Sequence, residues 1–186
     1  MAQLTMKLQA LTDYRAPALP EGYTLTTLDP ETDIQGWIET CAEGLGTAEW
    51  TEEDFRKRML ETDGLCAERI YVVKHEGRVI ATATAWPLSE TRGNLHMVAA
   101  RPEYRGKHLG SIVVGAVLEW LTAQGMTDIR LSTDDFRLAA IKVYLNFGFL
   151  PILSDFDMPG RWKAIYETLG VSYPVYHVRM EAAPLE

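Results

Sequence analysis

Hydrophobic and polar residues alternate in some stretches of this chain and follow a helical period in others, which predicts an α/β protein. The strand-like stretches are rich in β-branched and aromatic residues, and they cover residues 23–28, 70–75, 78–86, 95–100, 128–132 and 175–180. Between them, apolar residues recur every three or four positions, and these helices are predicted to begin near residues 33, 51, 112, 136 and 161. One mixed, mostly antiparallel sheet of about seven strands flanked by helices accommodates this order.

Glycine residues mark where several of these helices end. Gly44 and Gly46 interrupt the first helix, while Gly125 and Gly148 stop two later ones, because glycine readily adopts the left-handed conformation that ends many helices. The glycine-bearing loop between the first two helices is typical of a lid near a binding site, and an exposed connecting turn is equally compatible. Residues 1–20 show little periodicity and are expected to form an N-terminal arm or a short helix.

Length and composition indicate a single globular domain over residues 1–186. Hydrophobic residues make up 47% of the chain and charged residues 24%, which is ordinary for a soluble protein. No apolar run approaches the ~20 residues of a membrane span, and no secretory segment is evident, so a cytoplasmic protein is expected. The formal net charge of −8 argues against a nucleic-acid partner. Cys41 and Cys66 lack metal-like spacing and are interpreted as structural thiols.

Residues 97–111 have the order of groups expected of a phosphate-binding turn. An apolar run ends in a proline turn, a basic loop containing Gly106 and Gly110 follows, and a helical period then begins. The first N–H groups of a helix lack partners within the helix and lie at the positive end of its dipole, which suits a phosphate. The glycines allow close approach, and Arg105 and Lys107 add positive charge. An ordinary strand-to-helix turn with solvated charges is the alternative.

This stretch resembles the coenzyme A pyrophosphate loop of the GNAT family of N-acetyltransferases. The family pattern is Arg/Gln-x-x-Gly-x-Gly/Ala after a Val-x-Pro strand end, often written Pro-x-Tyr-Arg-Gly-Lys-Gly-x-Gly. The matching residues here are Pro102, Tyr104, Arg105, Gly106, Lys107 and Gly110. His108 stands where the family usually has glycine, and Ala100 stands where it often has valine.

A second stretch, in the helix predicted near residue 136, extends the resemblance. The family often shows Asn-x-x-Ala-x-x-x-Tyr-x-x-x-Gly-Phe, and the residues at these positions are Arg137, Ala140, Tyr144, Gly148 and Phe149. Arginine therefore replaces the asparagine. The helical period places Phe136, Ala140, Val143 and Phe147 in one apolar stripe.

The resemblance implies the GNAT (acyl-CoA N-acyltransferase) fold, with an acetyl-CoA-binding core over residues 95–150. It implies direct transfer of an acetyl group from acetyl-CoA to a primary amine through a tetrahedral intermediate, with no metal. The strand before the loop would pair with the pantetheine arm through the backbone of Val98 and Ala100, and the loop would hold the pyrophosphate. The residues implied to bind the cofactor are Val98, Ala99, Ala100, Arg105, Gly106, Lys107, His108, Leu109, Gly110, Ser111, Arg137 and Tyr144.

Tyr144 matches the position of the general acid in the family. A phenol with a pKa near 10 is a suitable proton donor to a departing thiolate. Taken from the residue pattern alone, a packed aromatic side chain on an apolar helix face is the favoured interpretation of Tyr144, and the family match reverses that preference.

His96 is the candidate general base. It precedes Val98 by two residues in a predicted strand and is expected to project from the same face, and imidazole titrates near neutral pH. A core histidine without a catalytic role is the alternative. The competing bases are Glu49, Glu53, Asp134 and a chain of water molecules.

The acceptor amine, in a small molecule or a peptide, is not readable from the sequence. Trp50 and the turn at residues 44–46 are candidates to line an acceptor pocket, although Trp50 is equally compatible with a core position. A non-catalytic acyl-CoA-binding or sensing module is the alternative function, and an O-acyltransferase or an enzyme for longer acyl groups is a third. The final strand and tail are compatible with a homodimer.

Overall fold

The computed structural model describes residues 3–46 and 50–172. These residues belong to two compact units. The larger unit covers residues 15–129, and the smaller unit covers residues 1–14 together with residues 130–186. The expectation of one domain over the whole chain stays a prediction.

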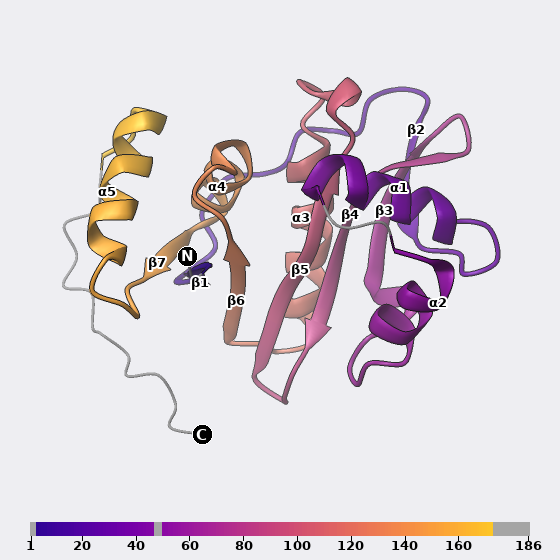
Figure 1. The fold of residues 1–186 in the computed structure, drawn as a ribbon, viewed down its shortest axis with the longest axis horizontal. Coiled ribbons are helices and arrows are strands. Elements are labelled where there is room, and N and C mark those ends of the chain that lie inside the picture. Colours follow the sequence, from indigo (N-terminus) through magenta and orange to yellow (C-terminus); the bar gives the residue numbers. More distant parts are fainter. Residues whose placement is uncertain (1–2, 47–49, 173–186) are drawn as a thin grey trace. The chain divides into compact units, whose positions relative to one another are not determined.

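The larger unit is built on a four-stranded antiparallel sheet with helices on both faces (Figure 1). Its elements are β2 (Tyr23–Thr27), α1 (Ile34–Leu45), α2 (Glu52–Phe55), the π-helical turn η1 (Arg56–Leu60), the 3₁₀ turn η2 (Ala67–Arg69), β3 (Ile70–His75), β4 (Arg78–Pro87), β5 (Arg92–Ala100), the 3₁₀ turn η3 (Pro102–Tyr104) and α3 (Leu109–Ala123). The strands lie in the order β2-β3-β4-β5. Helix α1 packs on one face with α2 beside it, and α3 packs on the opposite face. The elements predicted here are confirmed, with shifts of a few residues at their ends.

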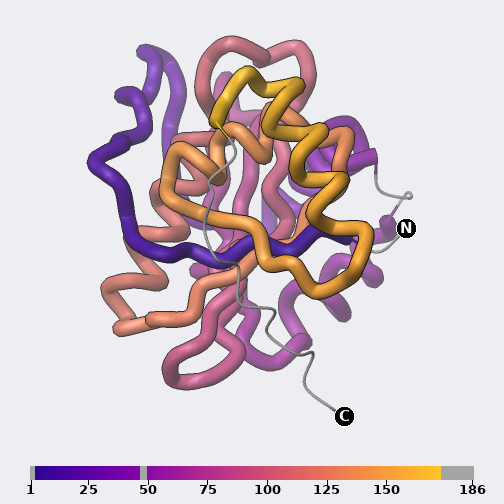
Figure 2. The backbone as a smooth tube through the Cα atoms, turned by 90° about the vertical axis from the view of Figure 1, so that its left-hand side faces the viewer, coloured from indigo at the N-terminus to yellow at the C-terminus, as the bar shows by residue number. Residues whose placement is uncertain are grey.

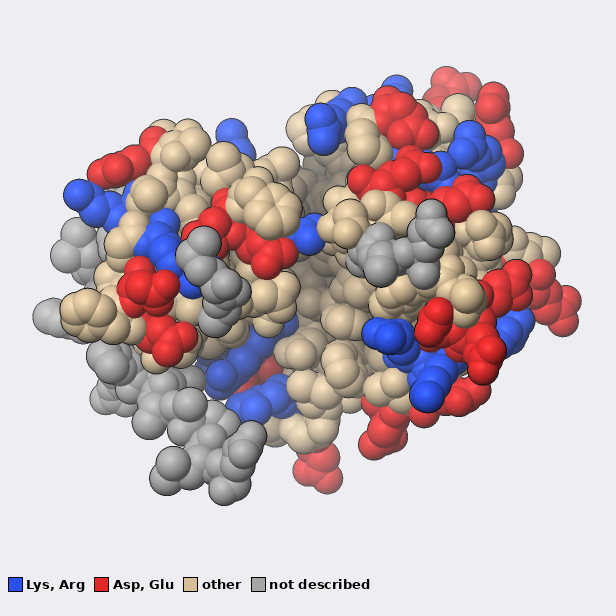
Figure 3. All heavy atoms as spheres, viewed as in Figure 1, with Lys and Arg blue, Asp and Glu red and all other residues tan. Residues whose placement is uncertain are grey.

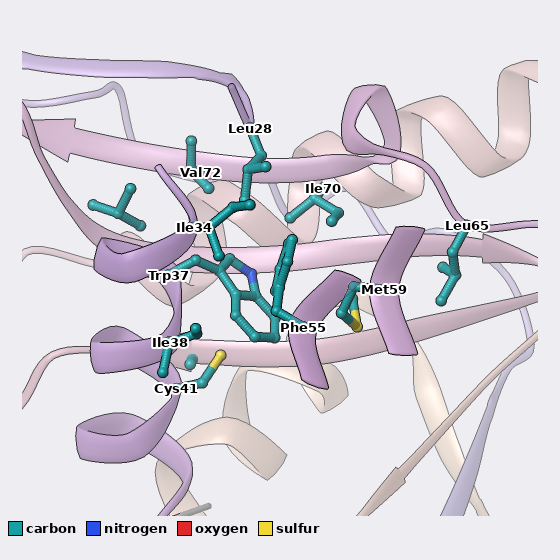
Figure 4. Packing of buried hydrophobic residues seen from close by; sticks show 12 residues of the cluster. Leu28, Ile34, Trp37, Ile38, Cys41, Phe55, Met59, Leu65, Ile70 and Val72 are labelled. Carbon is teal, nitrogen blue, oxygen red and sulfur yellow. The ribbon is translucent and has the colours of Figure 1, made fainter. Parts of the chain in front are cut away.

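A cluster of buried apolar side chains joins α1 and α2 to the sheet (Figure 4). Trp37 and Phe55 are fully buried, and their rings meet edge to face with centroids 4.8 Å apart. The indole Nε1 of Trp37 donates to Oγ1 of Thr82 in β4 at 3.0 Å, which satisfies the only polar atom of that side chain. The other members are Leu28, Ile34, Ile38, Cys41, Met59, Leu65, Ile70, Val72, Val79 and Ala99. The cluster confirms the amphipathic helix predicted after residue 33.

Helix α1 approaches the end of β5 so closely that one position has no room for a side chain. A Cβ on Gly44 would lie 2.8 Å from the carbonyl oxygen and 2.9 Å from the amide nitrogen of Ala100. The predicted end of the helix at residues 44–46 is confirmed, because α1 ends at Leu45 and Gly46 follows with φ +63°, whereas Gly44 itself still belongs to the last turn. Glycine at position 44 therefore serves the close approach of helix and strand.

Arg101, the residue after β5, is buried, and its guanidinium donates hydrogen bonds to α1 and β4. Its two terminal nitrogens donate to Glu39 Oε2 at 2.7 Å and to Glu43 Oε1 at 2.8 Å. Its Nε lies 3.2 Å from both Oγ1 of Thr40 and the carbonyl oxygen of Val79. Hydrogen bonds to the Glu39 carboxylate hold its pKa below the usual value, with the larger effect from Arg101 and a smaller one from the side-chain amide of Gln35. This network fastens α1 to the chain immediately before the basic loop.

The smaller unit contains three antiparallel strands in the order β6-β1-β7 and two helices among its described residues. The elements are β1 (Leu4–Leu8), β6 (Asp128–Thr133), which begins in the larger unit, α4 (Leu138–Phe147), β7 (Phe149–Ile152) and α5 (Met158–Leu169). The described residues form seven strands. This confirms the predicted fold class, which is a mixed and mostly antiparallel sheet flanked by helices. The strand predicted over residues 175–180 lies outside the described residues.

The N-terminal residues form a strand rather than the predicted arm or short helix. Strand β1, which is part of the indigo segment in Figure 2, pairs with β6 on one side and with β7 on the other. Leu4, Met6 and Leu8 are buried, and the residues between them are half-buried. This alternation is the signature of a strand, but it spans only five residues.

The apolar stripe predicted for α4 is wrong. The helix begins at Leu138, and its buried residues are Ile141, Tyr144 and Phe147. Phe136 lies before the helix and is 76% exposed. The predicted stripe was aligned on Phe136, outside the helix, and its positions 140 and 143 lie one residue before the buried positions 141 and 144, an offset that rotates the expected face by about 100°. Tyr144 consequently lies on the buried face.

Charged side chains of both signs occur together on one face of the protein. On the face drawn in Figure 3, red acidic groups lie among blue basic groups, in a chain with a net charge of −8. No helix within the described ranges is long and apolar enough to cross a membrane.

We expect Gly44→Ala to destabilise the larger unit by about 1–3 kcal/mol, the usual cost of overpacking a tight contact. The matched control is Gly36→Ala in the same helix, where the new Cβ would lie 3.4 Å from Val79, within ordinary contact distance. The control should be neutral or stabilising, because alanine favours the helix by roughly 0.5–1 kcal/mol over glycine. Thermal and urea unfolding measure both variants, and equal stability of the two would contradict the close approach.

Candidate functional site

Strand β5 contains a β-bulge before the basic loop. Thr84 of β4 pairs with His96 and Thr82 pairs with Ala99, so two residues of β5 lie opposite a single residue of β4. At the bulge, Met97 has φ +48°, a left-handed conformation that is rare for a residue with a long side chain. Bulges bend a strand and redirect its side chains, and they occur frequently next to active sites.

Because of the bulge, the predicted alignment of His96 with Val98 is wrong. Residues two apart share a face only in a regular strand. Here His96 shares its face with Ala99, since their partners Thr84 and Thr82 lie two apart on β4. Ala99 belongs to the cluster under α1. His96 therefore lies on the α1 side of the sheet, and Val98 points to the other side.

His96 lies beside an aromatic ring and an unsatisfied hydroxyl on this face. The ring centroids of His96 and Trp86 are 5.0 Å apart. The indole Nε1 of Trp86 donates to the carbonyl oxygen of Asp63 at 3.0 Å. On β4, the hydroxyl of Thr84 is buried without a hydrogen-bond partner among the described residues. Burial lowers the pKa of His96. The imidazole is therefore neutral at neutral pH, the form that accepts a proton.

The loop between β5 and α3 adopts left-handed backbone conformations at two positions. Gly106 has φ +81°, and His108, the residue that precedes the first turn of α3, has φ +57°. Glycine, which the GNAT pattern usually has at the position of His108, adopts this left-handed conformation easily. Histidine adopts it more readily than most other residues. A Cβ on Gly106 or Gly110 would meet nothing within 4 Å. The backbone is therefore open at both glycines, next to the N–H groups that begin α3.

The loop exposes its cations and buries two of its other side chains. Leu109 and Ser111 are each 3% exposed and anchor the start of α3, while Arg105 and Lys107 are exposed. Within residues 3–46 and 50–172, neither cation is ion-paired with a carboxylate, in contrast to Arg101. The loop thus presents positive charge that the described part of the chain does not neutralise.

Tyr144 and Arg137 belong to the smaller unit. Tyr144 is 5% exposed, and its ring centroid is 6.1 Å from that of Phe149. Burial raises the pKa of Tyr144, against the opposing effect of the positive charge of Arg137, so its hydroxyl stays protonated across neutral pH. Arg137 Nε donates to Oδ2 of Asp134 at 2.8 Å. Asp134, a candidate base, is therefore held in an ion pair.

The remaining sequence candidates differ in their surroundings. Trp50 is half-buried against the α1 cluster, with its ring centroid 5.7 Å from that of Trp37 and the guanidinium of Arg58 5.1 Å from its centre. Glu53 is exposed in the first turn of α2, and Glu49 lies outside the described residues. No group of three or more potential metal ligands occurs among the described residues.

The sequence profile described as the acetyltransferase (GNAT) family matches residues 32–149, more than half of the chain. The chain belongs to the GNAT acetyltransferase family. A mycothiol acetyltransferase of Thermobispora bispora is 30% identical over 155 residues, which cover 77% of this chain and 52% of that protein. The human N-acetyltransferase 8B is 30% identical over 101 residues, or 52% of this chain and 43% of that protein. The chain thus spans about half the length of these GNAT relatives.

Solved structures of GNAT proteins show the same fold. A GCN5-related N-acetyltransferase from Sphaerobacter thermophilus matches with a TM-score of 0.65 at 21% identity, over 80% of this chain and 48% of that one. The ribosomal-protein-S18-alanine N-acetyltransferase from Escherichia coli matches with a TM-score of 0.56 at 21% identity, over 69% of this chain and 77% of that one. The predicted GNAT fold is confirmed.

Sequence reasoning missed three features of the larger unit near the loop. The bulge at Met97 has no local signal, because the residue in the left-handed conformation is not glycine. Gly44 has the signal of a turn but lies inside a helix. The unsatisfied hydroxyl of Thr84 depends on its neighbours in space. By contrast, the glycine of the family pattern does indicate the left-handed position at His108.

We expect His96→Gln to change the pH profile of kcat/KM without changing the affinity for coenzyme A. A base is active in its neutral form, so activity falls as the pH drops through its pKa. Because burial lowers the pKa of His96, the acidic limb of the wild type should lie below the ordinary histidine value of about 6.5.

In the variant this limb should move or disappear, as measured by initial rates across pH. Asn94→Ala, a change in the same strand, is the matched control and should keep the limb. An unchanged limb in His96→Gln would assign the base role to a carboxylate or to water.

Proposed function

We propose that this protein transfers the acetyl group of acetyl-CoA to a primary amine of a small molecule or a peptide. The observation that carries the proposal is the loop at residues 105–111, which lies within the part of the chain that matches the GNAT family. It combines left-handed backbone, open glycines and two cations that form no ion pair within the described residues, at the start of α3. These are the groups that a pyrophosphate requires.

The residues of this loop fit the phosphate end of coenzyme A. The N–H groups of the first turn of α3 have no acceptor within the helix. Open space at Gly106 and Gly110 lets a pyrophosphate approach the backbone, and Arg105 and Lys107 supply charge. We propose that the backbone of Val98 and Ala100 pairs with the pantetheine arm, as the family resemblance implies. Acetyl-CoA supplies the activated acyl group.

The reaction forms one carbon–nitrogen bond and breaks one carbon–sulfur bond. The amine nitrogen contributes its lone pair to the acyl carbon, and the sulfur leaves with the bonding electrons as a thiolate. One proton leaves the nitrogen and one reaches the sulfur, so the products are an N-acetyl amine and free coenzyme A. We assign the first proton to His96, directly or through water, and the second to Tyr144.

Tyr144 suits the role of proton donor because it stays protonated. Because burial raises its pKa above the ordinary value of a phenol, the hydroxyl stays protonated across neutral pH. A neutral hydroxyl stabilises the developing thiolate by donating a hydrogen bond as the carbon–sulfur bond breaks. It follows that Tyr144 should produce no basic limb in the pH profile of kcat below about pH 10, its ordinary pKa.

The names of similar proteins suggest which acceptors to test. One relative is named for mycothiol, and one structural neighbour is named for the alanine of a ribosomal protein. We therefore propose an acceptor panel of amines that carry a thiol, polyamines, amino sugars and short peptides with free amino termini. Mass spectrometry identifies the acetylated product without interference from acceptor thiols. Binding of acetyl-CoA without any turnover would favour a non-catalytic sensing module.

We expect Tyr144→Phe to lower kcat with the best acceptor by roughly 10²–10⁴-fold, the usual contribution of a positioned acid. Folding and coenzyme A affinity should stay near wild type, because only a hydroxyl is removed. The loss should be smaller for thioesters whose thiols are more acidic. Tyr166→Phe, which alters a second buried tyrosine of the same unit, is the control and should leave kcat unchanged. A Tyr144→Phe enzyme with the wild-type rate would show that Tyr144 serves packing alone.

We expect Gly110→Trp to weaken coenzyme A binding by at least tenfold, or about 1.4 kcal/mol, because the indole would occupy the open space beside the helix start. Calorimetry measures the affinity. Gly160→Trp in α5 is the matched control, since a Cβ on Gly160 also meets nothing within 4 Å. Undiminished affinity in Gly110→Trp would remove the loop from the site.

A further inference from the structure

Three aromatic rings from distant parts of the chain meet beside the basic loop. Tyr23 begins β2, His75 ends β3, and Tyr104 ends η3. The rings of Tyr23 and His75 are stacked with centroids 4.3 Å apart and an angle of 21° between their planes. The ring of Tyr104 meets both edge-on, at 6.3 Å from Tyr23 and 5.8 Å from His75. We call Tyr23, His75 and Tyr104 the ring cluster.

The sheet holds two members of the ring cluster in place. Tyr23 and His75 are register partners in the antiparallel pair of β2 and β3, so their side chains project from the same face as direct neighbours. The turn that follows His75 is tight, with Glu76 and Gly77 both at positive φ. The stack therefore forms a rigid platform at the end of the sheet.

The third member connects this platform to the loop. Tyr104 immediately precedes Arg105, and its backbone N–H donates to the carbonyl oxygen of the buried Arg101 at 3.1 Å. Further along, the ammonium of Lys107 lies 5.6 Å from the centre of the Tyr23 ring, within the range of a cation–π contact. The ring cluster thus contacts the loop at its first residues and again at Lys107.

His75 contributes a ring rather than a polar atom to the cluster. Its Nδ1 is buried and has no hydrogen-bond partner among the described residues. A buried nitrogen without a partner adds nothing to stability through hydrogen bonding. The stacked contact with Tyr23 and the edge-on contact with Tyr104 are the contacts that join the His75 ring to the cluster.

We infer that the ring cluster positions the basic loop and so determines how tightly the protein binds the pyrophosphate of acetyl-CoA, with His75 as the positioning residue at its centre. The inference rests on the proposed function, which assigns that pyrophosphate to the loop. A loop held in its binding conformation before the ligand arrives loses less conformational entropy on binding. The cluster touches the loop and not the reacting atoms, so it should act on donor affinity and not on the chemical step.

The test compares His75→Ala with His75→Phe. Removing the ring should raise the Kd for coenzyme A and the KM for acetyl-CoA by about tenfold, through lost preorganisation, with kcat within twofold of wild type. Phenylalanine keeps the stacking surface and should restore both constants. Tyr71→Ala, which removes another half-buried ring from β3 away from the loop, controls for general weakening of the β2–β3 pair and should leave both constants unchanged.

A second donor locates the effect on the ligand. S-acetylpantetheine carries the thioester but no pyrophosphate, so its KM should be the same for His75→Ala and the wild type. The inference is overturned if His75→Ala binds coenzyme A like the wild type, if kcat falls instead of affinity, or if the KM for S-acetylpantetheine rises equally. A wild-type protein that fails to bind coenzyme A would overturn the proposed function, and this inference with it, before any variant is compared.

Discussion

The candidate site depends on the hydrogen bonds that the buried guanidinium of Arg101 donates to α1 and β4. A charge removed from water is costly unless it is paired and hydrogen-bonded, and here Glu39, Glu43, Thr40 and the Val79 carbonyl together accept hydrogen bonds from all three nitrogens of the guanidinium. Because these partners come from α1 and β4, the arrangement is complete only when helix and sheet are correctly packed. Arg101 stands between the last residue of β5 and the first of η3. The end of the strand and the start of the loop are therefore positioned by the same network.

Backbone strain is concentrated on either side of this anchor. Met97 and His108 both adopt left-handed conformations without being glycine, at a cost of roughly 1–2 kcal/mol each. Such residues persist where the surrounding structure determines their conformation, and they gather at functional sites. The segment between them contains the strand end and the cations that we assign to acetyl-CoA. Across this bulge His96 lies on the α1 face, beside Trp86 and the hydroxyl of Thr84, which has no hydrogen-bond partner in the described part of the chain.

The predictions from sequence succeeded where the signal was long and periodic. The strands at residues 70–75 and 78–86 and the helix after Asp33 were predictable, because their apolar faces repeat over several turns or pairs. Strand β1 was missed since an alternation of five residues is a weak signal. The buried face of α4 was misassigned because Phe136 has the composition of a core residue but precedes the helix. Local composition does not show where a short element begins.

The sequence alone determined the family and the position of the basic loop, since both reside in contiguous residues whose spacing is itself the motif. The tertiary structure decided what surrounds that loop. Three of its features join residues that are far apart along the chain. Gly44 lets α1 approach Ala100, the bulge places His96 on the α1 face, and the ring cluster brings together Tyr23, His75 and Tyr104. These contacts depend on where the bulge interrupts the β4–β5 pairing and on how closely α1 packs on β5, and both are set by residues that are distant from one another in the sequence.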